Sequence, residues 1–237
     1  MKMTMWLALP LTILAAGSAR AEGSLALTEA GMDVFSAYVW RGYEVADKAA
    51  VQPTATIAVS DTPFALNLWG SFVVQERSDF SAVDEVDATL SLNREVAIGH
   101  QSWALSGGGT LYTFPGAEDG YRRSEEVFAS ATMVHPLAPS VRGFYDFGLF
   151  DAAYVSIGVA PAFRLSESLA VTLAPSIGLG DADTSFGLQD ATLAASTAFE
   201  WSGVLLRPTI GYSYAPDTVN PDEQGIWGGL GVRFVAP

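Results

Sequence analysis

Few side chains in this sequence could carry out chemistry, because it has two histidines and no cysteine. His100 and Ser102 stand two residues apart, so a strand there would present the imidazole and the hydroxyl on one face. Such a pair is the minimum for a nucleophile and its base, an arrangement also used by lipid hydrolases built on membrane barrels. A hydrolase needs a third, orienting carboxylate as well, and no spacing identifies one. We therefore expect no enzyme and keep a barrel-type lipid-modifying hydrolase as an alternative.

Metal and cofactor chemistry has no better support. There is no histidine pair at ligand spacing and no cysteine, so a zinc site is not expected. Clustered carboxylates could hold Ca²⁺ or Mg²⁺, but their spacing does not match a calcium-binding loop. We interpret them as a solvated outer rim, bridged by divalent ions to lipopolysaccharide, and expect no metal site and no cofactor. The clusters are Asp84-Glu85-Asp87, Glu118-Asp119, Glu125-Glu126, Asp181-Asp183 and Asp217-Asp222-Glu223.

The elements that must position these residues are strands. Apolar residues alternate with small or polar ones in segments of about ten residues, separated by turn-forming sequences. In residues 169–179, Leu169, Val171, Leu173 and Ile177 share one face, and Ala, Thr, Ser and Gly fill the other. No apolar run after residue 21 is long enough for a transmembrane helix.

The alternation predicts twelve strands, with ten as the alternative. They lie near residues 30–41, 51–60, 64–75, 85–95, 102–114, 125–134, 141–149, 153–165, 169–179, 190–200, 204–214 and 226–235. Outer-membrane barrels alternate short periplasmic turns with longer outer loops. The candidate short turns are 61–63, 135–140, 166–168 and 201–203, and the long polar stretches are 42–50, 76–84, 115–124, 180–189 and 215–225.

The N-terminus has the features of a secretory signal peptide, namely Lys2, an apolar stretch over residues 5–16 and the small-residue site Ala19-Arg20-Ala21. We assign residues 1–21 to a cleaved signal peptide and residues 22–237 to one barrel domain. A retained anchor helix is the alternative, but the apolar run is shorter than a bilayer span. Loss of two bases would change the formal net charge from −14 to −16. Nucleic acid is not an expected partner, since binding it requires clustered Lys and Arg.

Alternation alone does not say whether the apolar face meets lipid or a protein core. The other face is mainly Gly, Ala, Ser and Thr, and beyond the leader only Lys48 is a lysine, whereas a soluble barrel needs many long charged side chains outside. Aromatic residues near strand ends, such as Trp40 and Trp227, fit interfacial girdles. These observations favour a membrane barrel over a soluble periplasmic β-barrel that binds a small apolar ligand. Charges opposite the apolar positions are candidates to line a wet lumen: Asp87, Arg142, Asp146, Arg164, Glu200, Arg207 and Arg233.

One segment resembles a known family. The run Val34-Phe35-Ser36-Ala37-Tyr38-Val39-Trp40-Arg41-Gly42 resembles the opening strand of the TorF-type family of porin-like barrels. Leu68-Trp69-Gly70-Ser71-Phe72 is similar to that family's third strand. The resemblance covers residues 32–75 and implies a β-barrel channel without catalytic residues.

The family motif in this chain comprises Tyr38, Trp40, Arg41 and Gly42. From the residues alone, Arg41-Gly42 is a strand-end cation followed by a residue that lets the chain bend. The functional alternative makes Arg41 a contact with the pore or with a partner.

The sequence thus predicts an all-β protein, a closed antiparallel up-and-down transmembrane β-barrel in the outer membrane of a Gram-negative bacterium. The expected function is a narrow, porin-like diffusion channel for small solutes, because twelve strands lie between filled small barrels and wide pores. The expected partners are outer-membrane lipid and lipopolysaccharide, the outer-membrane assembly machinery and small solutes.

Overall fold

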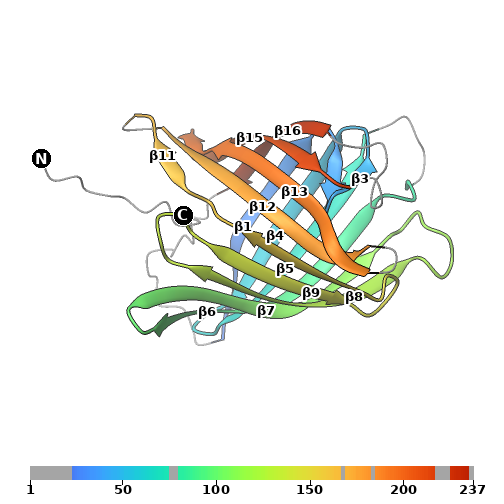
Figure 1. Cartoon of the computed structure of the whole chain (residues 1–237), viewed down its shortest axis with the longest axis horizontal. Helices are drawn as coiled ribbons and strands as arrows, with labels where there is room; N and C mark the ends of the chain where they lie inside the picture. Colours follow the sequence, from blue (N-terminus) through green and yellow to red (C-terminus); the bar gives the residue numbers. More distant parts are fainter. Residues whose placement is uncertain (1–22, 75–79, 167–168, 183–184, 217–224, 235–237) are drawn as a thin grey trace, which may run out of the picture.

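Every regular element of the computed structural model is a β-strand in the residues that it describes, which are 23–74, 80–166, 169–182, 185–216 and 225–234. Twelve strands pair antiparallel with their neighbours along the chain. The ring closes because β1 pairs with β16 and β10 pairs with both β9 and β12 (Figure 1). No helix in these ranges is long and apolar enough to cross a membrane.

The twelve barrel strands are β1 (Leu25–Phe35), β4 (Ala50–Val59), β5 (Phe64–Val73), β6 (Glu85–Ile98), β7 (Gln101–Thr113), β8 (Arg123–Met133), β9 (Ser140–Asp146), β10 (Ala152–Gly158), β12 (Ala170–Ala182), β13 (Ser185–Thr197), β15 (Val204–Tyr214) and β16 (Gly225–Phe234). Two short strands, β11 (Ala162–Arg164) and β14 (Phe199–Trp201), continue the pairing of β12 and β15. A separate hairpin, β2 (Tyr38–Trp40) and β3 (Tyr43–Ala46), pairs within itself.

The prediction of twelve strands in a closed antiparallel barrel is confirmed, with three local corrections. The first strand ends at Phe35, because the chain turns inward before Tyr38. The predicted loop 42–50 contains β3, and most of the predicted loop 180–189 is strand, since β12 and β13 continue pairing up to Ala182 and Ser185. The predicted signal peptide, residues 1–21, lies outside the described residues.

The two ends of the barrel differ in their connections. At the end where β1 starts and β16 stops, neighbouring strands are joined by tight turns, such as residues 60–63, 99–100 and 202–203. We call this the short-turn end. The opposite, long-loop end carries connections such as 36–49 and 114–122. In outer-membrane barrels short turns face the periplasm and long loops face outward.

The distribution of side chains is the reverse of that in a soluble protein. The exposed large side chains are apolar along the strands, as with Leu25, Leu66, Leu90 and Ile177. The buried side chains inside the ring are mostly polar and include the carboxylates of Glu85, Asp87, Glu126, Asp146 and Asp190. Such an exterior matches hydrocarbon rather than water, and such an interior suits a wet lumen. A soluble barrel around an apolar ligand would need the opposite arrangement.

Exposed aromatic side chains mark both ends of this apolar band. Phe64 and Trp201 lie near the short-turn end, and Tyr212 and Tyr214 lie near the long-loop end, as interfacial girdles require. Trp40 and Trp227, which the sequence placed in the girdles, instead lie inside. Trp40 belongs to the inner hairpin, and the indole Nε1 of Trp227 donates to the inward Ser213 hydroxyl.

Candidate functional site

The connection from β1 to β4 forms the β2–β3 hairpin near one end of the barrel (Figure 1), and its contacts with β8 and β13 place it inside the ring. Its turn consists of two residues, because Trp40 pairs with Tyr43 across Arg41 and Gly42. Both turn residues have positive φ, +49° for Arg41 and +86° for Gly42, as a type I′ turn requires. The left-handed conformation costs Arg41 about 1–2 kcal/mol, so contacts elsewhere must stabilise it.

Those contacts lie on the far side of the barrel. The Arg41 guanidinium donates from Nη1 to Oε2 of Glu126 at 2.7 Å and from Nη2 to Oε1 at 2.9 Å. In the ring of twelve strands, the strand directly opposite β1 is β9, six strands away in either direction. Glu126 belongs to β8, the neighbour of β9. The hairpin therefore crosses the whole width of the lumen.

Aromatic side chains surround the same guanidinium. Its Cζ lies 4.2 Å from the ring centroid of Phe144, 4.4 Å from that of Trp40 and 4.8 Å from that of Tyr154. The side chain of Arg41 is 12% exposed and that of Glu126 is 1% exposed. The Tyr112 hydroxyl donates to Oε1 of Glu126 at 2.8 Å. Each group of this buried ion pair therefore has a partner, which is the condition under which burying charges is tolerated.

The backbone of the turn is held by β13. Gln189 donates from Nε2 to the Arg41 carbonyl oxygen at 2.9 Å. A bulge in the β12–β13 ladder turns both Gln189 and Asp190 inward. A Cβ on Gly42 would lie 2.8 Å from the Asp190 Cβ and 3.1 Å from the Gln189 carbonyl oxygen, so only glycine permits this approach.

The base of the hairpin is attached to the near wall. The buried Tyr38 hydroxyl donates to Oε2 of Glu85 on β6 at 2.8 Å, and its ring lies 5.8 Å from that of Trp69 on β5. Burial raises the pKa of the Tyr38 phenol, and the nearby Glu85 carboxylate raises it further, so the hydroxyl stays a donor. Beside it, Ser36 accepts from the Gly228 backbone N–H at 3.1 Å.

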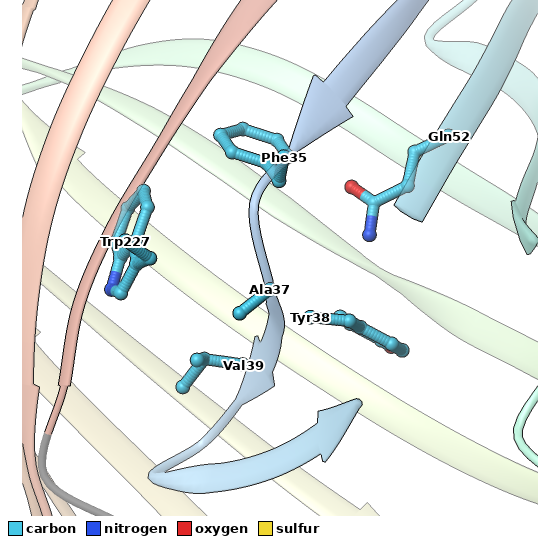
Figure 2. A pocket seen from close by; sticks show the side chains of 6 residues that line it. All are labelled: Phe35, Ala37, Tyr38, Val39, Gln52 and Trp227. Atoms are coloured by element: carbon cyan, nitrogen blue, oxygen red, sulfur yellow. The ribbon is translucent and has the colours of Figure 1, made fainter. Parts of the chain in front are cut away.

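Two cavities lie against the hairpin. The larger, of about 330 Å³, lies against β5, β6 and β7, and it is lined by Tyr38, Trp40, Asn67, Trp69, Asp87, Thr89, Thr110 and Tyr112. We call it the near-wall cavity. The smaller, of about 120 Å³, lies on the other side of the hairpin, between Phe35, Gln52 and Trp227. Figure 2 shows Ala37 and Val39 directed toward Trp227 there, and Tyr38 directed the opposite way.

The pairing register places all seven candidate lumen residues on the inward side of the wall, in two groups. Asp87 and Asp146 lie in the long-loop half beside the hairpin, and Arg142, Arg164, Glu200, Arg207 and Arg233 lie in the short-turn half. Asp146 accepts from the Ser124 hydroxyl at 2.7 Å and from the backbone N–H of Gly148 at 3.0 Å, so it braces a loop. Arg233 is paired with Asp33 at 2.6 Å and with Glu29 at 2.9 Å.

Two sequence interpretations are corrected here. The outer-rim assignment is wrong for Glu85, Asp87 and Glu126, which are buried inside the barrel, and for Asp84, whose buried carboxylate accepts from the Val73 and Ser81 backbone N–H groups. The pairing register of β6 and β8 turns Glu85, Asp87 and Glu126 to the inward face, and proximity to a predicted loop does not reveal that register.

The second correction concerns the His100 and Ser102 pair. His100 lies in an exposed turn before β7, so it is not on the strand that carries Ser102. Within the described ranges, no three His, Asp or Glu side chains are grouped to hold a metal ion.

The sequence also missed several partners of the hairpin. The residues that contact it or line its cavity come from four strands, β5, β9, β10 and β13, and they are Trp69, Phe144, Tyr154, Gln189 and Asp190. The signal for Trp69 was only its place in the third-strand resemblance, Gln189 fell in the predicted loop 180–189, and the other three had no signal beyond an inward position in the alternating pattern. Arg41 and Gly42 were recognised as part of a motif, but as the end of a wall strand.

A closed antiparallel barrel with an apolar exterior and a polar interior is the architecture of the class of outer-membrane β-barrel proteins. Residues 18–143, more than half of the chain, match the model of the family described as "Bacterial protein of unknown function (Gcw_chp)", and the chain belongs to that family. The hairpin and its Glu126 contact both fall within the matched residues. No curated protein matches the sequence.

Two of the solved structures that the chain matches are named a porin and an outer membrane channel. The NanC porin is 10% identical with a TM-score of 0.53, over 86% of this chain and 100% of that one. An outer membrane channel from Pseudomonas putida F1 is 10% identical with a TM-score of 0.46, over 93% of this chain and 100% of that one. At this identity, the likeness to NanC concerns the fold alone.

Proposed function

We propose that the protein is a narrow, porin-like diffusion channel for small solutes in the bacterial outer membrane. The observation that carries this proposal is the hairpin, which crosses a polar lumen from β1 to β8 and leaves restricted space on either side. Lumen constriction by an inward loop limits the size of solutes that can pass. The barrel is similar in fold to NanC, a protein that is named a porin, and this similarity supports the proposal.

The finer assignments are part of the same proposal. A relationship with the TorF-type barrels rests on the sequence resemblance of the motif residues Tyr38, Trp40, Arg41 and Gly42, which build the hairpin in this barrel. The apolar band would contact outer-membrane lipid and lipopolysaccharide, and β16 would present the final strand to the assembly machinery. Export would depend on the predicted signal peptide at residues 1–21.

Planar bilayer recordings test the channel. Refolded wild-type protein should give small, discrete current steps. A variant in which a short Gly-Ser linker replaces residues 37–47 should give steps that are several-fold larger, since the lumen is then open. Equal conductance of the two proteins would contradict the role of the hairpin, and silence of both would contradict a channel. Heat-dependent migration of each unboiled protein in detergent gels controls for folding of the barrel.

A further inference from the structure

We propose that the near-wall cavity binds a small organic cation with N–H donors, a primary ammonium or a guanidinium. This inference rests on the proposed function, because it names the class of solute that the channel selects. It concerns the space between the β2–β3 hairpin and strands β5, β6 and β7.

The first observation is a carboxylate with one unpartnered oxygen. Asp87 lines the cavity from β6 and is only 8% exposed. Its Oδ1 is buried and has no hydrogen-bond partner in the part of the chain that the structure describes. Buried polar atoms are nearly always paired, because an unpaired one forfeits its hydration without compensation. A ligand that donates a hydrogen bond into the cavity would satisfy this oxygen.

The second observation is the charge around the cavity. Glu85 precedes Asp87 by one inward position on β6, so two carboxylates lie side by side. The Tyr38 hydroxyl hydrogen-bonds Glu85 but is a neutral donor and does not cancel its charge. Arg41, the one cation of the hairpin turn, is engaged by Glu126. A bound cation would compensate the negative charge, whereas a neutral solute would not and an anion would be repelled.

The third observation is the aromatic lining. Trp40, Trp69 and Tyr112 all line the cavity, and aromatic faces attract ammonium and guanidinium groups. The hairpin tip shows the same chemistry within this molecule. There the Arg41 guanidinium is held by one carboxylate and three aromatic rings. The near-wall cavity offers the same combination of groups without an internal cation to fill it.

Isothermal titration calorimetry on the refolded barrel in detergent tests the inference, with butylguanidinium as the probe. Butylurea is its control, because it has nearly the same shape and no charge. We expect saturable binding of butylguanidinium and binding of butylurea that is about tenfold weaker or more, the loss that goes with a hydrogen bond to a charged group. Equal affinities for the two probes, or no binding of butylguanidinium, would overturn the proposal.

Variants locate the site. Asp87→Asn should weaken butylguanidinium binding about tenfold or more. Glu200→Gln removes one inward carboxylate at the other end of the barrel and should leave the affinity unchanged. If Asp87→Asn does not fold, Trp69→Leu provides the second test, since it removes an aromatic face and keeps the carboxylate. Unchanged affinity in a folded Asp87→Asn or Trp69→Leu barrel would refute the site.

The calorimetry does not depend on an open pore, so the two proposals can fail separately. Binding without current steps would support the cation site and reject the channel. Current steps without binding would support the channel and reject the cation site.

Discussion

The two halves of the lumen share one wall but have different contents. The long-loop half holds the hairpin, a group of aromatic rings and the buried carboxylates of Glu85, Asp87 and Glu126. The short-turn half holds Arg142, Arg164 and Arg207, whose side chains are exposed to the lumen. A single inward connection therefore divides a polar tube into a narrow, acidic half and a wide half that carries inward charges of both signs, since Glu29, Asp33 and Glu200 accompany the arginines there.

Within the narrow half, the two ends of the hairpin differ in how their neighbouring carboxylates are paired. At the tip, the Glu126 carboxylate is paired by the protein's own Arg41. At the base, Asp87 has an oxygen that no described residue pairs. The Glu126 carboxylate thus anchors the hairpin at its tip. The Asp87 carboxylate at its base leaves a site for a hydrogen-bond donor from outside the protein. The following predictions test this difference.

The largest effect is expected from Glu126→Ala, which leaves the Arg41 guanidinium buried without its carboxylate. Breaking a buried pair in this way costs about 3–5 kcal/mol, so the tip should leave the far wall. Single-channel conductance should rise several-fold. The double variant Arg41→Ala with Glu126→Ala is the control, because it removes both charges and should disturb the hairpin by less than the sum of the single changes. Unchanged conductance in Glu126→Ala would show that the ion pair does not hold the tip.

Gly42→Ala should have the next largest effect. A Cβ there would lie 2.8 Å from the Asp190 Cβ, and the overpacking costs about 1–3 kcal/mol. The positive φ adds about 1–2 kcal/mol. Gly203→Ala is a matched control, since Gly203 also has positive φ, +79°, but no atom lies within 4 Å of its added Cβ. Conductance should rise for Gly42→Ala alone, and an equal response of both variants would argue against close contact between the tip and the wall.

Tyr38→Phe tests the base of the hairpin. It deletes the hydroxyl that donates to Glu85 at 2.8 Å and keeps the ring against Trp69. The lost hydrogen bond to a charged group is worth about 1.5–3 kcal/mol. Because the tip contacts remain, we expect a lower unfolding temperature in detergent and noisier current steps, with a mean conductance close to that of the wild type. A large rise in mean conductance would mean that the base, rather than the tip, anchors the hairpin.

The smallest effect is expected from Arg207→Ala in the wide half. Arg207 is inward and exposed, so its charge is well screened, and its removal should shift the reversal potential in a salt gradient slightly toward cation selectivity. Arg94→Ala is the control, because Arg94 lies on the outward side of β6. A shift of similar size in both variants would indicate that lumen charge does not govern selectivity.

Much of the wall could be predicted from the sequence. Period-two alternation is a local property, and each strand meets the same two environments along its length, so the pattern in residues 169–179 directly predicted the two faces of β12. The placement of Arg142, Arg207 and Arg233 opposite apolar neighbours followed from the same rule. The proposed leader at residues 1–21 stays a prediction.

The path of residues 36–49 was decided only by the tertiary structure. Their sequence continues the apolar and aromatic character of β1, which is why a wall strand was predicted up to Trp40 and Arg41. The turn at Arg41 and Gly42 is stabilised by Glu126, 85 residues away, and by Gln189 on the bulged strand β13. Such contacts depend on closure of the ring, which brings β8 and β13 to face the tip, and no local pattern contains that information. The sequence by itself therefore determined the barrel and its two faces, and only ring closure decided what fills the lumen.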